Sequence, residues 1–181
     1  MTNQIRNPND EIGDAFIAAA RHTLGEGIRK IEHCVGQLND DQIWWRPQPE
    51  MNSIANIMLH LSGNLRQWIV AGVGGTKDVR NRPLEFSDRS NRPKGEVLGT
   101  LKKTVGEADA VLARLTASEL LSPKRIQGYD NVVIGAIMDT IPHFRGHVQE
   151  IIHITRQQLG EEYQFDFVPK GKEQESAGGA A

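Results

Sequence analysis

The chain has 181 residues, enough for one well-buried core, and we expect a single domain over residues 1–168. Its 21 basic and 23 acidic residues are spread along the sequence and leave a net charge of -2, so no basic stripe is present that could follow a nucleic-acid backbone. Apolar runs end well before the roughly 18 positions of a membrane-spanning helix. The first residues also lack the basic cluster and apolar stretch of a signal peptide. We therefore expect a cytoplasmic protein with no nucleic-acid or membrane partner.

Apolar residues recur three or four positions apart in four segments, which is the spacing of one helix face. The chain's one cysteine, Cys34, falls on the apolar face of the first segment and is expected to be a small core residue. A lone cysteine excludes an intrachain disulfide and a thiolate cluster, so any metal must be held by nitrogen and oxygen. The predicted helices run from Asp10 to Leu38, from Ser53 to Ile69, from Pro93 to Leu115, and from a start between Asn131 and Val133 to Leu159.

The connections after the first and second helices are long. Pro47 and Pro49 break the chain after the first helix. The stretch from Thr76 to Pro93 is polar and shows no periodicity, and loops of that length are often functional. No segment alternates in the way of a strand, so we predict an all-α protein, a four-helix bundle with long connections after its first and second helices. Residues 169–181 have too little apolar content to pack and should form a disordered tail.

Two histidines, His143 and His147, lie four positions apart in the last predicted helix. Side chains at this spacing share one helix face, with Cβ atoms about 5 to 6 Å apart, and two imidazoles so placed can converge on one metal ion. Pro142 precedes the pair and is expected to kink the helix beside it. The spacing alone is weak support, because a helix with several histidines produces such pairs by chance.

A third ligand would have to come from another helix, and His60 is the best candidate. It lies next to the apolar positions Ile57 and Leu61 of the second predicted helix and so faces the bundle or its edge. A buried imidazole needs partners for its nitrogens, and two interpretations remain open at this point. His60 is either a metal ligand, or it bonds to a backbone carbonyl or to a neighbour such as Asn64.

Two carboxylates lie on the same stripe of the last helix as the histidine pair. Asp139 precedes His143 by four positions, and Glu150 follows His147 by three. Glu150 could orient a ligand imidazole, bind the metal, or act as a general base. For Asp139 we prefer the interpretation of a solvated helix charge.

The segments "SIANIMLHLSGNLRQWI" and "PHFRGHVQEIIHITRQ" resemble the DinB-like superfamily of four-helix proteins, in an uncharacterised bacterial branch, and the resemblance covers about Asp10 to Leu159. In that family, one histidine on the second helix and two on the fourth typically hold a divalent metal. The resemblance places these ligands on His60, His143 and His147, with Gln149 in the position of the family's glutamine. Zinc and nickel both accept imidazole ligands, so we expect one of these two metals. Bundles of this type are commonly dimers, and we expect a homodimer.

The resemblance says less about the reaction. Its characterised members include transferases and isomerases that use low-molecular-weight thiols, and three histidines leave the metal a free position for a thiolate or for water. We therefore expect a metal-dependent enzyme that activates a small thiol for S-transfer. The alternatives are a metal-dependent hydrolase, a non-catalytic stress protein that binds a metal or ligand, and a purely structural bundle.

Overall fold

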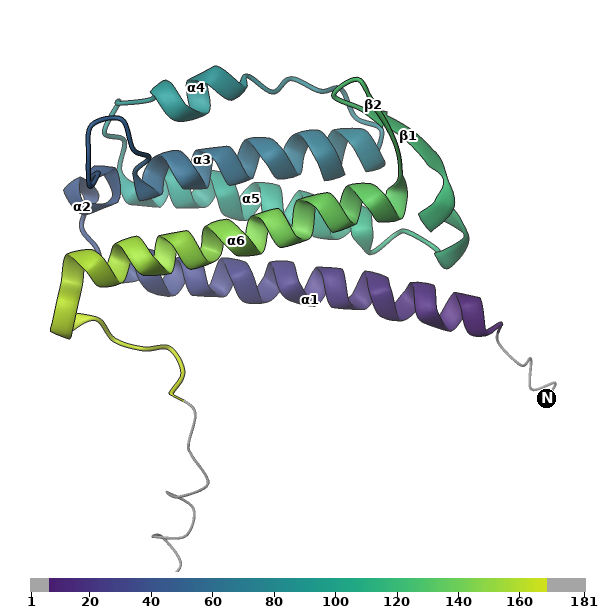
Figure 1. Ribbon diagram of the computed structural model, residues 1–181, viewed down its shortest axis with the longest axis horizontal. Coiled ribbons are helices and arrows are strands. Elements are labelled where there is room, and N and C mark those ends of the chain that lie inside the picture. Colours follow the sequence, from purple (N-terminus) through teal and green to yellow (C-terminus); the bar gives the residue numbers. More distant parts are fainter. Residues whose placement is uncertain (1–6, 169–181) are drawn as a thin grey trace, which may run out of the picture.

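A computed structural model of the chain describes residues 7–168. The tail predicted at 169–181 lies outside these residues. Four long helical segments form a bundle, as predicted, and they match the predicted ranges closely: α1 (Pro8–Gly36), α3 (Ile54–Leu65) continued by the π-helical segment η1 (Arg66–Val73), α5 (Lys94–Leu112) and α6 (Val133–Leu159) (Figure 1). Among the described residues, no helix combines the length and the apolar character that crossing a bilayer requires.

Side-chain caps mark the starts of α1 and α3. Ser53 accepts a hydrogen bond from Asn56 N while Asn56 bonds back to Ser53 N, which forms a capping box at the start of α3. Asn7 caps α1 ahead of Pro8. The helix α6 continues through Pro142 and ends at Leu159, and the next residue, Gly160, has a φ of 56° that suits glycine.

The chain direction explains the long connections. In Figure 1, α1 and α6 run in one direction along the bundle and α3 and α5 in the other. Because α3 and α5 are parallel, the chain must return along the whole bundle between them, and this return segment passes over the outer side of α3. The predicted loop at 76–93 is this segment, and it contains a short helix, α4 (Arg82–Ser87), that contacts α3.

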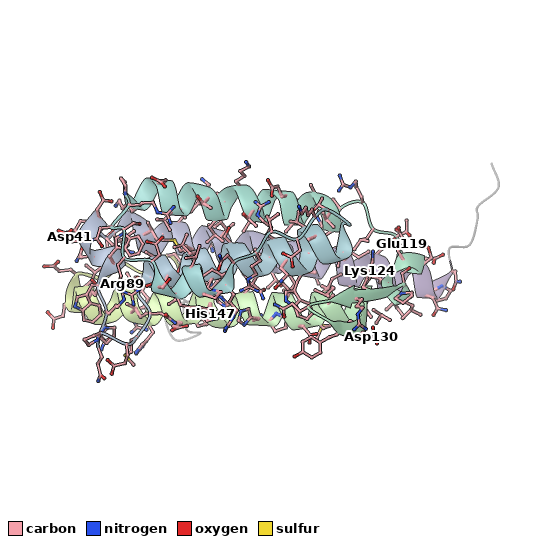
Figure 2. All side chains as sticks on the ribbon, turned by 90° about the horizontal axis from the view of Figure 1, so that it is seen from above. Asp41, Arg89, Glu119, Lys124, Asp130 and His147 are labelled. Atoms are coloured by element: carbon pink, nitrogen blue, oxygen red, sulfur yellow. The ribbon has the colours of Figure 1, made fainter. Side chains whose placement is uncertain are left out.

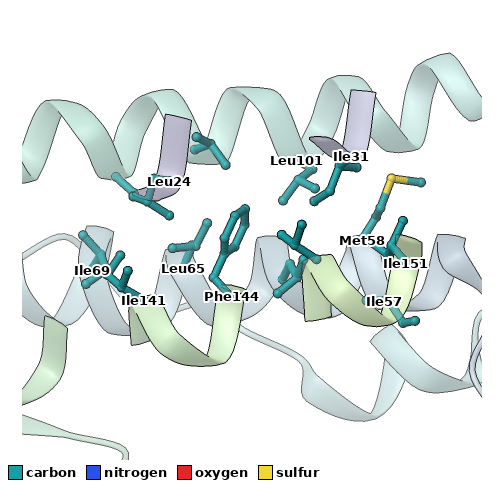
Figure 3. Packing of buried hydrophobic residues seen from close by; sticks show 14 of the residues in the cluster. Leu24, Ile31, Ile57, Met58, Leu65, Ile69, Leu101, Ile141, Phe144 and Ile151 are labelled. Carbon is teal, nitrogen blue, oxygen red and sulfur yellow. The ribbon is translucent and has the colours of Figure 1, made fainter. Parts of the chain in front are cut away.

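The core lies between the four long helices (Figure 3). Phe144 of α6 is fully buried at its centre, close to Leu65 of α3. A Cβ atom at Gly27 of α1 would lie 2.5 Å from Phe144 Cε1, so this glycine provides the space that the ring fills. Cys34 is 1% exposed, as expected for a small core residue.

The expectation that no segment forms a strand was wrong. Strands β1 (Pro123–Ile126) and β2 (Tyr129–Val132) pair antiparallel, and Gln127 and Gly128 between them both have positive φ, at 54° and 83°. Two positive φ angles are typical of a two-residue hairpin turn, usually signalled by Asn-Gly or Asp-Gly. The sequence here has Gln-Gly, and four-residue strands are too short for alternation to identify. A further short helix, α2 (Asp40–Trp44), lies in the first predicted linker.

Candidate metal centre

Three imidazole rings meet midway along the bundle, His60 from α3 and both His143 and His147 from α6. One ring nitrogen from each histidine lies within 4.8 Å of the other two. The ring centroids are 4.5 Å apart for the α6 pair and 5.1 Å from His60 to each, and the rings are close to perpendicular. Figure 2 shows His147 about halfway along the bundle, between Arg89 near one end and Asp130 of the hairpin near the other. The two helices therefore bring together the three histidines that the sequence predicted.

A buried glutamate fixes the orientation of His60. Glu85 of α4 lies with Oε2 2.9 Å from His60 Nδ1, and both side chains are less than a tenth exposed. A carboxylate accepts hydrogen bonds and cannot donate them when ionised, so the imidazole proton lies on Nδ1. The lone pair of His60 is then on Nε2, which points to His143 Nε2 at 3.0 Å.

Arg80 keeps this glutamate ionised. Its guanidinium donates from Nε to Glu85 Oε1 at 2.7 Å and from Nη2 to Glu85 Oε2 at 2.8 Å, and its side chain is only 3% exposed. Burial opposes ionisation of Glu85, but the hydrogen bonds from Arg80 and His60 outweigh it and hold the pKa of this carboxyl below its usual value. A Cβ atom at Gly63 of α3 would overlap the carboxylate, so glycine at this position lets Glu85 approach the helix.

A second glutamate orients His147. Glu150, one turn further along α6, accepts a hydrogen bond from His147 Nδ1 at 2.7 Å. This hydrogen bond lowers the pKa of Glu150, so the carboxylate stays ionised and the His147 lone pair lies on Nε2. The sequence left several roles open for Glu150, and this contact fits the one in which the carboxylate orients the imidazole of His147.

His143 is held in its neutral form. Burial, with the neighbouring charges of His147, His60, Arg80 and Arg82, lowers the pKa of His143 from 6.5 to about 4. Only a neutral imidazole can bind a metal. The site therefore offers His143 in the form that metal binding requires at neutral pH.

Comparison with known families agrees with this architecture. A family model described as a protein of unknown function, DUF1572, matches residues 11–172, most of the chain. The chain belongs to the DUF1572 family. Among solved structures, it is similar to a DinB-like protein from Bacillus cereus ATCC 10987, with a TM-score of 0.59 and 14% identity over 73% of this chain and 85% of that one. No curated protein matches the chain.

The structural match shows that this DUF1572 protein has the fold of a DinB-like protein, and the all-α fold is confirmed. At 14% identity the structural likeness concerns the fold alone. The chemistry of the site follows from its own geometry.

The three imidazoles of the DUF1572 chain fit a divalent metal ion. Nitrogen ligands at about 2.0 to 2.1 Å from a tetrahedral ion lie roughly 3.3 Å from one another. The 3.0 Å between Nε2 of His60 and of His143 is close to that value, and the ligand nitrogens of all three histidines lie within 4.8 Å of one another. Metal-binding histidines usually donate a hydrogen bond from their other ring nitrogen to a carboxylate or carbonyl oxygen. Glu85 and Glu150 accept such bonds from Nδ1 of His60 and His147.

Three other expected residues have different surroundings. Asp139 is exposed and accepts a hydrogen bond from Asn131 at 3.2 Å, in agreement with a solvated helix charge. Gln149 is exposed on the opposite side of α6, where it lines a 220 Å³ cavity with His22 and other residues of α1, so it is not part of the histidine cluster. Asn64 does not bond to His60, because Glu85 occupies that position.

Proposed function

We propose that this protein binds one divalent metal ion, zinc or nickel, through His60, His143 and His147, and that it uses the ion to activate a small thiol for S-transfer. The observation that supports this proposal is the convergence of three imidazoles from α3 and α6, two of which have their Nδ1 protons held by carboxylates. Such a site presents three neutral ligands to an ion of charge +2 and leaves it electrophilic.

The chain's own residues have distinct tasks in this proposal. The three histidines hold the ion, Glu85 and Glu150 orient His60 and His147, and Arg80 keeps Glu85 charged. When bound, the ion supplies Lewis acidity that favours the thiolate over the thiol at neutral pH. The thiol sulfur then bonds to an electrophilic carbon of the acceptor as the leaving group departs, and the thiol proton passes to solvent.

Metal binding should depend on all three histidines. We expect one zinc or nickel ion per chain in protein purified without a histidine tag, and none at stoichiometric level in His60→Ala, His143→Ala or His147→Ala, as measured by elemental analysis. Zinc at about 100 times its dissociation constant should stabilise the wild-type fold by about 2.7 kcal/mol and leave the variants unchanged.

His153 provides a matched control, because it is an exposed histidine of the same helix outside the cluster. His153→Ala should keep full metal content. Full retention of the metal by His60→Ala, with circular dichroism showing intact helices, would contradict the three-histidine site.

Thiol transfer should require the site and not the protein's own cysteine. Cys34 is buried, and burial raises the pKa of its thiol, so this sulfur stays protonated and out of reach of a substrate. We expect the metal-loaded protein to conjugate small thiols to an electrophilic acceptor at a rate that His143→Ala abolishes and Cys34→Ala preserves. If no thiol in a panel reacts faster than with His143→Ala, while activated esters are hydrolysed in a metal-dependent way, the hydrolase alternative replaces S-transfer.

A further inference from the structure

A cavity of 280 Å³ opens directly beside the histidine cluster and shares two of its residues, His60 and His143. This volume is just below the range of about 300 to 1,000 Å³ that is usual for ligand pockets in proteins. Its other lining residues come from four different segments: Asn64 and Trp68 of α3 and η1, Arg80 and Arg82 of the return segment, Gln127 of the hairpin turn, and Asp139 and Thr140 of α6.

The two arginines of this cavity differ in how their charges are used. Arg80 is buried and bonded to both oxygens of Glu85, so its charge is already neutralised. Arg82 is exposed, and within residues 7–168 no carboxylate lies within ion-pair distance of it. Its guanidinium lies instead over the ring of Phe86, at 4.9 Å from the centroid.

That ring places Arg82 next to the metal centre. Phe86 packs on His60 with ring centroids 4.8 Å apart, so Arg82, Phe86 and His60 form a stack that leads from the cavity rim to the cluster. A planar guanidinium at a cavity rim binds carboxylates well, because two parallel hydrogen bonds fit its geometry.

Asp139 supplies the opposite charge from α6. Its carboxylate accepts a hydrogen bond from the neutral amide of Asn131. Within the described part of the chain, no cation forms an ion pair with Asp139. The same cavity therefore carries one guanidinium and one carboxylate without counter-ions. A third polar group is the Asn64 amide, whose buried oxygen has no hydrogen-bond partner within the described residues. A buried oxygen without a partner costs free energy. A hydrogen-bond donor of the ligand, reached by rotation of this amide, would remove that cost.

We propose that this cavity binds the zwitterionic amino-acid end of a small molecule, with the carboxylate of the ligand at Arg82 and its ammonium group at Asp139. The identity of the substrate rests in addition on the proposed function. If the site activates a thiol, the substrate is an α-amino acid thiol whose sulfur is directed to the three histidines. Arg82 and Asp139 are then specificity-determining residues.

The charge recognition can be tested without the metal and without catalysis. L-Serine has the shape of a cysteine-type ligand without a thiol, while ethanolamine lacks its carboxylate and 3-hydroxypropionate lacks its ammonium group. Binding to the metal-free protein can be followed by NMR through the indole N–H signal of Trp68, which lines the cavity. The indole of Trp44, bonded to Arg92 O at 2.9 Å, is a reference signal from elsewhere in the fold.

We expect L-serine to bind about tenfold more tightly than either single-charge ligand, as one charge-assisted contact predicts. Arg82→Gln should reduce its affinity to that of ethanolamine and leave ethanolamine unchanged. Asp139→Asn should reduce it to that of 3-hydroxypropionate. Arg145→Gln, on the opposite side of α6, is the control and should change none of these affinities.

Two failures are distinguishable. Equal affinity of the three ligands, or a loss in Arg82→Gln that affects all of them alike, would overturn the proposal even if the protein binds stoichiometric zinc. Absence of stoichiometric zinc would instead contradict the proposed function, while the charge-specific losses in metal-free protein would still support amino-acid binding in this cavity.

Discussion

Glu85→Ala is expected to destabilise the metal-free protein by about 3 to 5 kcal/mol, because it leaves a buried charge without its partner. The Arg80 side chain is 3% exposed and both of its hydrogen bonds to a carboxylate are with Glu85. Denaturation in urea, monitored by circular dichroism, measures this loss. The same change frees the His60 ring, so zinc affinity should also fall about 10- to 100-fold.

An exposed ion pair in the same part of the fold provides the comparison. Glu96 pairs with Arg92 on the surface, where the two side chains are 54% and 33% exposed, and Glu96→Ala should cost less than about 1 kcal/mol. Replacing Arg80 and Glu85 together by Met and Leu should restore most of the stability, because no unpaired charge remains. If Glu85→Ala costs no more than Glu96→Ala, the return segment does not bury this pair.

A substitution at Gly63 tests the same contact from the other side. Gly63→Ala introduces a methyl group where the Glu85 carboxylate lies, so it should weaken zinc binding although it alters neither charge nor ligand. Gly99→Ala on α5 is the matched control, because a Cβ there meets no atom within 4 Å. This exposed helical position should gain up to about 1 kcal/mol from its better helix propensity.

The part of this site that lies on helices could be predicted from the sequence. Helical periodicity assigns His143 and His147 to one face, and it places His60 among apolar residues that must face the bundle. Periodicity could not place α3 and α6 side by side. The resemblance to a known family supplied that step, and in the structure the three histidines lie together.

The supporting residues could not be predicted, because they come from the return segment. Arg80 and Glu85 lie in a polar stretch without periodicity, 20 and 25 positions after His60, and nothing local indicates that they fold back onto α3. The available signals were indirect: a loop too long for a simple connection, and a buried histidine in need of a hydrogen-bond partner. Asn64, one helical turn from His60, was the natural candidate for that partner. The structure shows that a residue distant in sequence fills the role.

Phe144→Ala is expected to destabilise the protein by about 3 to 5 kcal/mol, the usual cost of truncating a buried phenylalanine. Phe144 lies between His143 and His147 in the sequence. Its side chain is fully buried, on the face of α6 that packs against α1 and α3. Met138→Ala on the same helix should change stability by less than about 0.5 kcal/mol, since Met138 is 55% exposed. Chemical denaturation of the metal-free proteins measures both.

The close contact between Phe144 and Gly27 makes a sharper test, because it predicts a sign change in a double-mutant cycle. Gly27→Ala alone places a methyl group 2.5 Å from Phe144 Cε1, and overpacking of this kind costs about 1 to 3 kcal/mol. Phe144→Leu removes that ring atom and leaves a gap at the same point, so Gly27→Ala should become stabilising in the Phe144→Leu background. Additive effects of the two changes would show that α1 and α6 do not pack in the register seen here. When Phe144 packs against Gly27 in this register, His143 and His147 lie beside His60 of α3. The cycle therefore also tests the helix packing that positions the three histidines.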